Sequence, residues 1–232
     1  MIGSDARPVG PPVDATPAAW PSPVRLAGRY GSVARLDAAR DAAALWLAFS
    51  GHDELWTYIS AHGPFADEDA FSAWLEAREA LKDPFYYTVR DEDDRAIGLV
   101  ALMEIRPAMR VIEVGSIVYS PLLQRTALAT ETQYLIARYA FETLGYRRYE
   151  WKCDSLNAPS RRAALRYGFS FEGIFRQHMI TKGRSRDTAY FSMLDGEWPM
   201  RKSNFERWLA PENFDPEGRQ KVSLAALNIQ KA

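Results

Sequence analysis

The chain has 232 residues, of which 47% are apolar and 25% charged, and its formal net charge is −1. This composition is ordinary for one globular domain with tails, and it offers neither a basic field that would attract nucleic acid nor a polybasic block that would attract a membrane surface. The single cysteine, Cys153, excludes an intrachain disulfide, and with three scattered histidines the chain does not suggest a metal centre. No apolar run is long enough to span a bilayer, and the N-terminus lacks the apolar core of a secretory signal, so we expect a cytoplasmic protein.

Prolines dominate residues 1–23, where six of them predict an extended chain without regular structure. Two interpretations remain open for this segment. It is either a flexible tail or a strap held on the domain surface by Val13, Trp20 and Val24. We expect the domain itself to occupy residues 24–210, with a C-terminal extension over 211–232.

The first half of the domain shows helical periodicity followed by strand-like patterns. Asp37 is placed to cap a helix, Gly51 to end it, and Asp83-Pro84 to close the last helix of this half. The predicted elements, in order, are a strand over 33–36, helices over 38–49, 53–59 and 67–82, and strands over 85–89, 97–105 and 111–119.

The second half alternates strands with helices and ends in a hairpin. The predicted elements are a helix over 125–144, a strand over 146–152, a helix over 158–167, strands over 171–181 and 188–194 around a turn at 182–185, and a helix over 198–209. Helices first, then an antiparallel meander, a strand–helix–strand crossover and a closing hairpin predict an α/β (α+β) fold with a mixed sheet.

The helix predicted after residue 124 starts with the sequence QRTALATE, which is rich in small residues. The first turn of a helix leaves several amide N–H groups unpaired and favours negative charge, and small side chains let a phosphate approach them. Arg125 and Thr126 add a charge and a hydroxyl. Local chemistry alone equally allows a plain helix start capped by Thr126 or Thr130.

Two further motifs follow this turn in order, namely Asn157-Ala158-Pro159-Ser160 ahead of Tyr167-Gly168-Phe169, and then Phe171-Glu172-Gly173. Together with the turn they make the chain resemble the GCN5-related N-acetyltransferases (the GNAT family), specifically the RimJ/RimL-like ribosomal-protein-alanine N-acetyltransferase branch, over roughly 33–195. The family motif Gln/Arg-x-x-Gly-x-Gly/Ala falls on residues 124–129, where Ala127 replaces the usual glycine. An alanine keeps its N–H, but it resists positive φ and adds a methyl group against the phosphate.

The resemblance implies a GNAT fold, with a mixed, mostly antiparallel, twisted sheet of about seven strands flanked by helices and splayed at the fourth and fifth strands. It also implies that acetyl-CoA is the co-substrate and that the acetyl group passes by direct attack to a primary amine, which is a protein N-terminus, an amino acid or a small amine. No nucleic acid, membrane or metal is expected, and the branch suggests a homodimer. Alternatives of other classes are a non-catalytic acyl-CoA-binding or regulatory module on the same fold, and an interaction domain without a cofactor.

The resemblance also assigns residues to the co-substrate. Backbone groups of Ile117, Val118 and Tyr119 would hold the pantetheine arm, and the helix start would hold the pyrophosphate. The expected cofactor-binding residues are Ile117, Val118, Tyr119, Gln124, Arg125, Thr126, Ala127, Leu128, Ala129, Thr130, Asn157 and Ser160.

Asn157 and Ser160 each have a second interpretation from their local chemistry. The amide of Asn157 suits a pantetheine amide, but asparagine is also common as a turn or helix-cap residue. The family position of Ser160 implies a general acid for the leaving thiolate, whose thiol has a pKa of about 8.5. Otherwise Ser160 is a helix serine that faces solvent or bonds to the backbone.

The amine must lose a proton before it attacks, because an alkylammonium has a pKa of about 10.4. The branch places a carboxylate base on the sixth strand, at the position of Met179, which cannot take a proton. The base is therefore missing, relocated or replaced by a water chain. Glu113 is the first candidate, because it is expected to share a strand face with Gly115 and Ile117. The other candidates are Glu104, Glu150 and His178, and Glu172 is expected to be structural.

Several remaining residues have both a functional and a core interpretation. No His/Asp relay accompanies Cys153, so we expect a small buried residue and not an acyl-accepting nucleophile. The aromatic residues that would line an acceptor pocket, or simply fill the core, are Trp56, Tyr58, Tyr119, Trp151 and Phe175.

Overall fold

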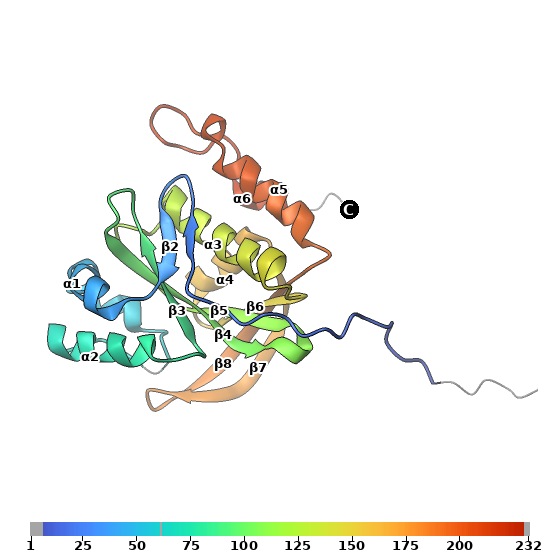
Figure 1. Cartoon of the computed structure of the whole chain (residues 1–232), viewed down its shortest axis with the longest axis horizontal. Helices are drawn as coiled ribbons and strands as arrows, with labels where there is room; N and C mark the ends of the chain where they lie inside the picture. The colour runs from blue at the N-terminus through green and yellow to red at the C-terminus, as the bar shows by residue number, and fades with distance from the viewer. Residues whose placement is uncertain (1–6, 61, 230–232) are drawn as a thin grey trace, which may run out of the picture.

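The computed structural model describes residues 7–60 and 62–229. They form an eight-stranded sheet in the order β1-β2-β3-β4-β5-β6-β8-β7, with helices on both faces (Figure 1). Neighbouring strands pair antiparallel except β5 and β6, which are parallel. The predicted mixed, mostly antiparallel sheet flanked by helices is confirmed, with one strand more than the resemblance implied.

The strands are β1 Arg25–Ala27, β2 Ser32–Arg35, β3 Phe85–Arg90, β4 Ala96–Arg106, β5 Val111–Tyr119, β6 Arg148–Asp154, β7 Ser170–Thr181 and β8 Arg184–Leu194. The extra strand is β1. It pairs with β2 over three residues only, which is too short for an alternating pattern to reveal it.

The α-helices are α1 Ala38–Phe49, α2 Glu68–Glu79, α3 Ala127–Arg138, α4 Ala158–Tyr167, α5 Trp198–Leu209 and α6 Leu224–Asn228. Shorter turns are the 3-10 segments η1 Asp53–Trp56, η2 Pro107–Met109 and η4 Pro211–Asn213 and the π turn η3 Tyr139–Thr143. The helix predicted over 53–59 is therefore a single short turn, and the helix predicted over 125–144 is α3 followed by η3.

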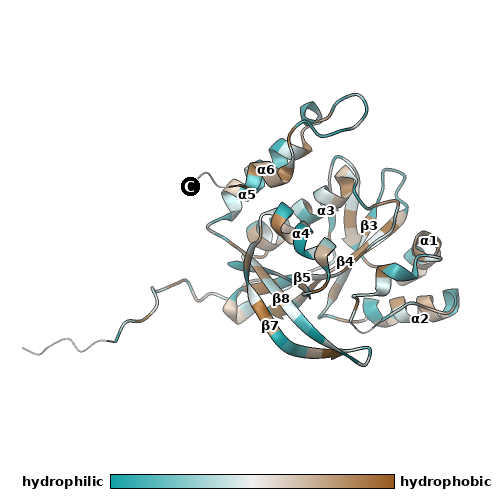
Figure 2. Cartoon of the chain, turned by 180° about the vertical axis from the view of Figure 1, so that it is seen from behind, coloured by the Kyte–Doolittle hydropathy of each residue, from teal (hydrophilic) through white to brown (hydrophobic). Residues whose placement is uncertain are grey.

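The helices form two layers that enclose two apolar cores. On one face α1 and α2 cover the sheet around Leu45, Phe71 and Leu99 (Figure 2). The Asp37 side chain caps α1 as predicted, because it accepts a hydrogen bond from the amide of Arg40 at 3.1 Å. On the other face α3, α4 and α5 cover the second core, whose fully buried side chains include Tyr149, Phe191, Phe205 and Ile112.

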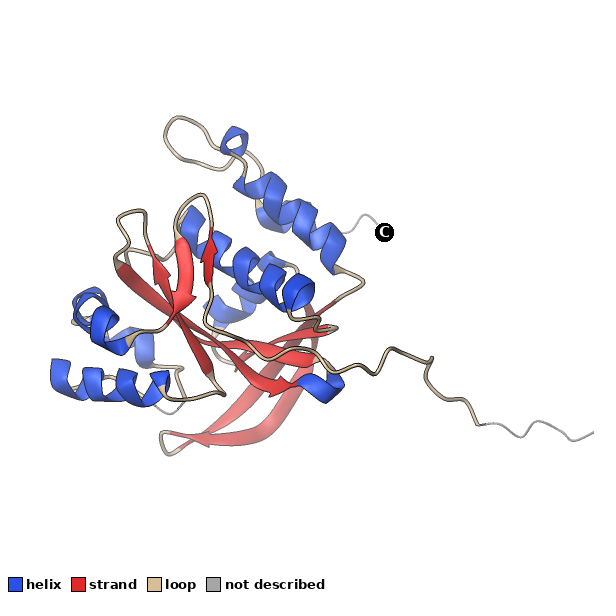
Figure 3. Ribbon diagram, viewed as in Figure 1, coloured by secondary structure: helices blue, strands red, loops and turns tan. Residues whose placement is uncertain are grey.

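The hairpin formed by β7 and β8 is longer than predicted and extends beyond the rest of the sheet (Figure 3). Its turn is Lys182-Gly183, with φ of +50° and +72°, and not the four-residue turn expected at 182–185. Two consecutive left-handed residues make the tight turn that matches the twist of paired strands, so β8 begins already at Arg184.

The described part of the proline-rich segment is held against the domain only near its end. The amides of Ala18 and Ala19 donate to the carbonyls of Pro107 and Leu144 at 3.1 and 2.8 Å. Of the three expected anchors, Val24 packs on the core, whereas Val13 and Trp20 are 56% and 52% exposed. The strap interpretation therefore holds for the backbone at Ala18 and Ala19 and for the side chain of Val24, and for the side chains of Val13 and Trp20 it is wrong.

The segment after α5 also packs on the domain. Asn228 in α6 donates to the carbonyl of Arg166 in α4 at 2.9 Å, and Arg201 in α5 donates to the carbonyl of Asn228 at 3.0 Å. None of the helices within the described ranges is long and apolar enough to cross a membrane.

Candidate functional site

Two neighbouring strands, β5 and β6, separate along part of their length. They pair only over residues 111–114 of β5 and 148–151 of β6. Beyond that point β5 is paired with β4 alone and β6 with β8 alone. The inner edges of both strands thus lack a strand partner, and an extended, amide-bearing ligand can pair with such an edge. The predicted splay of the fourth and fifth strands, counted without β1, is this gap.

A β-bulge at Ser116 turns β5 away from β6. Ser116 has φ +47°, and the register against β4 shifts between Gly115 and Val118. The bulge expected near Gly115 is present, but the left-handed residue is the serine. Because of the bulge Ile117 packs with the core under α3, on the face opposite to Glu113 and Gly115. The expectation that Glu113, Gly115 and Ile117 share a face is wrong for Ile117.

The N-termini of α3 and α4 both lie at this gap, because each helix follows one of the two parallel strands and parallel strands end at the same edge of a sheet. Thr126 caps α3, and its Oγ1 accepts from the amide of Ala129 at 3.1 Å. Within the described ranges the amides of Ala127 and Leu128 donate to no protein acceptor. These two N–H groups, with the helix dipole behind them, fit a pyrophosphate.

Ala127 does not have the backbone conformation that its place in the family motif suggested. It is the first residue of α3 and is helical, whereas the positive φ of this turn, +64°, belongs to the exposed Arg125. An alanine is therefore unstrained here, and its amide remains available.

Other side chains of the turn already have protein partners. Gln124 Nε2 donates to the carbonyl of Tyr119 at 2.8 Å, and Thr130 Oγ1 accepts from Arg166 at 3.0 Å. Leu128 and Ala129 are buried on the core side. What the helix start offers a ligand is therefore mostly backbone.

At the start of α4, Asn157 and Ser160 are linked by a cap. Asn157 Oδ1 accepts from the amide of Ser160 at 3.1 Å, which confirms the helix-cap interpretation. The side-chain amide of Asn157 donates to no acceptor among the described residues, so it is available to a ligand carbonyl. Ser160 Oγ accepts from Trp151 Nε1 at 3.0 Å.

Cys153 lies beside Ser160 and is buried. Burial raises the pKa of the Cys153 thiol, although a hydrogen bond with Ser160 and the nearby Arg186 and Arg161 act in the opposite direction. A raised pKa leaves little thiolate near neutral pH, which agrees with a buried structural residue and not with a nucleophile.

Glu113 lies at the start of the gap, on the face of the sheet opposite to α3 and α4. Its side chain is 5% exposed, and Oε2 pairs with Lys152 Nζ at 2.9 Å. Burial raises the pKa of Glu113 to about 7, with Lys152 opposing the rise. Oε1 makes no hydrogen bond to a described residue and lies beside Gly115, 3.3 Å from where a Cβ would sit.

Two other carboxylates, Glu150 and Glu172, form ion pairs with neighbouring basic side chains and are therefore poor candidates for the base. Glu150 contacts Arg106, Arg148 and Lys152 at 2.6, 2.7 and 3.3 Å, and although burial raises its pKa, these cations bring the pKa below its usual value. Glu172 has a pKa lowered by two hydrogen bonds from Arg148, as a structural residue would.

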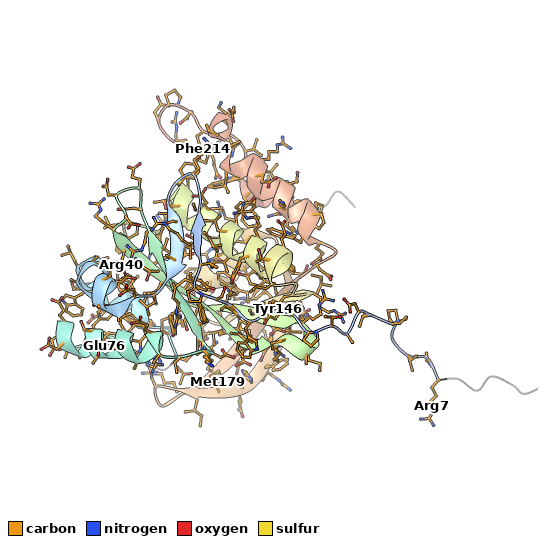
Figure 4. All side chains as sticks on the ribbon, in the orientation of Figure 1. Arg7, Arg40, Glu76, Tyr146, Met179 and Phe214 are labelled. Carbon is orange, nitrogen blue, oxygen red and sulfur yellow. The ribbon has the colours of Figure 1, made fainter. Side chains whose placement is uncertain are left out.

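Glu104, His178 and Met179 are the remaining positions at which a base was considered. Glu104 is exposed at φ +49°, and His178 bridges Thr188 and Tyr190 at 3.0 and 3.4 Å. Met179, at the family's base position, lies on the β7–β8 hairpin at the lower edge of the molecule and is 38% exposed (Figure 4). A thioether has no proton chemistry to offer there.

The five aromatic candidates for an acceptor pocket divide into two groups. Trp56 belongs to the aromatic core between α1 and α2, and Tyr119 and Trp151 lie on the α3 and α4 side, bonded to Gln133 and Ser160. For these three the pocket interpretation is wrong. Tyr58 and Phe175 are 38% and 53% exposed, and Phe175 packs on Tyr190 with ring centroids 4.1 Å apart.

The sequence interpretation missed several polar residues on the face of Glu113. Lys152 follows Arg148 and Glu150 at every second position of β6, and that charge pattern was visible. Arg186 was not recognisable as a strand residue, because the sequence predicted that this strand begins at Thr188. Nothing local in the sequence marks Tyr86, whose hydroxyl donates to Ser116 Oγ at 3.1 Å across strands far apart in sequence. Within the described ranges no group of three or more His, Cys, Asp or Glu side chains is arranged to hold a metal ion.

Comparisons with known proteins agree with this geometry. Residues 34–170 match the family described as "Acetyltransferase (GNAT) domain". A GCN5-related N-acetyltransferase from Brucella melitensis is 45% identical and has a TM-score of 0.90, over 93% of this chain and 98% of that one. A probable GNAT-family acetyltransferase from Chromobacterium violaceum is also 45% identical, with a TM-score of 0.78 over 83% of this chain and 98% of that one. The uncharacterized N-acetyltransferase YoaA of Bacillus subtilis is 26% identical over 67% of this chain and 88% of its own length.

The chain therefore belongs to the GNAT acetyltransferase family. Its fold matches those of solved GNAT proteins, and the family uses acetyl-CoA as co-substrate.

Proposed function

We propose that the protein is an acetyl-CoA-dependent N-acetyltransferase that passes the acetyl group directly to a primary amine. The observation that carries the proposal is the gap between β5 and β6, with the unpaired amides of α3 and the start of α4 at its edge. When bound, acetyl-CoA supplies the activated acetyl thioester. The chain supplies binding, orientation and proton transfer.

Binding is distributed over the two helix starts. The amides of Ala127 and Leu128 receive the pyrophosphate, and the inner edge of β5 around Ile117, Val118 and Tyr119 receives the pantetheine amides. The free side-chain amide of Asn157 donates to a carbonyl of the same arm. These contacts direct the thioester along the gap towards Ser160.

Ser160 donates a proton to the leaving sulfur. Because Trp151 donates to Ser160 Oγ, the hydroxyl keeps its own hydrogen to donate, either to the neighbouring Cys153 or, with acetyl-CoA bound, to the leaving sulfur. A thiol has a pKa of about 8.5, so the departing thiolate needs only a modest donor. Ser160 thus acts as general acid without a charged partner.

Glu113 accepts the proton of the attacking ammonium. Its Oε1 is free at the edge of the gap, and a pKa of about 7 suits a base that works near neutral pH. Lys152 holds Oε2 and keeps the carboxylate in place. This assignment replaces the carboxylate that the branch has at the position of Met179.

The finer assignments rest on sequence motifs. Ala129-Thr130-Glu131 and Asn157-Ala158-Pro159-Ser160 favour the RimJ/RimL-like branch, and that branch suggests a homodimer. We also propose a cytoplasmic location, and that the chain divides into a tail over 1–23, a domain over 24–210 and an extension over 211–232.

Two measurements test the proposal. Thermal unfolding with and without CoA should show stabilisation of about 2.7 kcal/mol at a ligand concentration of 100 Kd. A panel of amines should then release free CoA thiol from acetyl-CoA. Stabilisation without turnover for any amine would instead indicate the non-catalytic acyl-CoA-binding module, which the methionine at the base position of the branch favours. No stabilisation at all would contradict both.

A further inference from the structure

A buried arginine on β8 has no counter-ion among the residues that the structure describes. Arg186 is 8% exposed, and its one described hydrogen bond runs from Nη1 to Ser60 Oγ at 2.7 Å. Its Nε is buried without an acceptor, and no carboxylate of the described residues lies within ion-pair distance. Buried charges in proteins are normally paired, so an arginine left in this state indicates a missing anion.

A second guanidinium belongs to the same neighbourhood. Arg78 in α2 contacts His62 Nε2 at 3.1 Å, and its own Nε is also buried without an acceptor. Ser60 and His62, the contacts of the two arginines, are two positions apart in the chain, which places them within about 7 Å of each other. Both guanidiniums therefore flank one short loop between η1 and α2.

Three of the unpaired groups near this loop are N–H donors, and the first two are the Nε atoms of Arg186 and Arg78. Trp74 Nε1, which packs its ring against His62 at 5.4 Å, is a third buried N–H without an acceptor among the described residues. Burial lowers the pKa of His62, and Arg78 and Lys182 lower it further, so this ring is favoured in its neutral form. Donors without acceptors are satisfied by a ligand that only accepts, and an ionised carboxylate is such a ligand.

The cluster faces the side from which an acceptor must come. Arg186, Thr188 and Tyr190 alternate along β8 and so share one face, which is the face of Lys152, the residue paired with Tyr190. Lys152 in turn contacts Glu113. The co-substrate helices α3 and α4 cover the other face, so an amine that meets the thioester in the gap arrives past Arg186 and Glu113.

We propose that the acceptor amine carries a carboxylate, which Arg186 binds with Arg78 and Trp74 as further donors. This inference rests on the proposed function. It narrows the acceptors to free amino acids and similar small amino acids, because a protein N-terminus has lost its own carboxylate to the peptide bond.

The experiment compares matched acceptors, each an amino acid and its carboxamide, at saturating acetyl-CoA. For the wild-type protein kcat/KM should be higher for the acid by about 10- to 100-fold, the range of a charged hydrogen-bonded contact. In Arg186→Gln this preference should disappear, because kcat/KM for the amino acid falls to the value for its carboxamide. Arg184→Gln, which removes the same charge from an exposed position two residues away, should keep it.

A second variant separates recognition from a purely structural role. Ser60→Ala removes the described contact of Arg186 with the loop, and it should retain the preference for acids. If Ser60→Ala and Arg186→Gln behave alike, or if carboxamides serve as well as acids in the wild type, the proposal is wrong.

A readout without turnover keeps the two proposals apart. Amino acids, and not their amides, should stabilise the CoA-bound protein against heating, and Arg186→Gln should abolish that shift while CoA alone still stabilises it. If CoA stabilises the protein and no amino acid does, the acceptor inference fails and the co-substrate assignment stands. If CoA has no effect, the proposed function fails, and the same amino acid titration on the free protein still tests Arg186.

Discussion

Trp151 Nε1 donates a hydrogen bond of 3.0 Å to Ser160 Oγ and thereby joins β6 to the first turn of α4. The indole is a donor only, so it occupies a lone pair of the hydroxyl and leaves Ser160 to act as a donor itself. Burial of the indole on the core side fixes its orientation. The pair therefore pre-sets the direction in which Ser160 donates.

Replacing Ser160 with alanine should lower kcat about 100-fold, because general acid catalysis by one side chain contributes about 10²–10⁴-fold and the thiolate is a good leaving group. The affinity for CoA should change little. Steady-state rates and CoA titrations of the variant measure both. Ser155→Ala is the matched control, since the contacts of Ser155 are made by its backbone amide and carbonyl. Equal rates for Ser160→Ala and the wild type would remove the general acid role.

The pH dependence of kcat/KM should report Glu113. Burial raises its pKa to about 7, and a base works only when deprotonated, so activity should fall as the pH drops below about 7 and level off above it. In Glu113→Gln the rate should be low and this acid limb absent. Glu104→Gln should keep the acid limb but move it slightly to lower pH, because the charge of Glu104 helps to raise the pKa of Glu113. An unchanged limb in Glu113→Gln would assign the base to another group or to water.

The sequence allowed the fold to be predicted well wherever periodicity and caps act locally. The bounds of β5, α4 and α5 and the cap of α1 by Asp37 agree with the structure. Errors occurred where a tertiary or backbone effect decides. The two-residue turn Lys182-Gly183 depends on a lysine with positive φ, which residue preferences disfavour.

The site was predictable in part, because some of its elements also depend on local sequence signals. The helix starts of α3 and α4 follow from local motifs, and the caps by Thr126 and Asn157 are confirmed. The bulge at Ser116 inverts the faces of all later residues of β5, and no period-two pattern can anticipate an inserted residue. The pairing of Arg186 with Ser60 joins residues far apart in the chain, so only the folded structure reveals it.

Ala127→Gly, which restores the family's usual glycine, should not tighten CoA binding. Ala127 is already helical and offers its amide, so a glycine gains no needed freedom and costs up to about 1 kcal/mol of stability, less at a helix start. Thermal unfolding and CoA titration measure the two effects. Ala163→Gly, inside α4, is a control that carries the helix and packing penalties without altering the amides at the start of α3. A clear gain in affinity for Ala127→Gly would mean that the methyl group obstructs the phosphate.

Gly115→Ala should impair catalysis more than stability. A Cβ at this position would lie 2.4 Å from Met103 Sδ and 3.3 Å from Glu113 Oε1, so the methionine must move and the carboxylate is displaced from the edge of the gap. Met103 is flexible, and an over-packed site of this kind costs about 1–3 kcal/mol. The double variant Met103→Ala with Gly115→Ala gives the new methyl group room and should recover part of the stability. Its rate should recover only to the extent that the Glu113 carboxylate regains its original position. Unfolding curves and kcat/KM measured on the same samples separate these effects. A Gly115→Ala protein with full activity would show that the position of Glu113 Oε1 does not matter for the reaction.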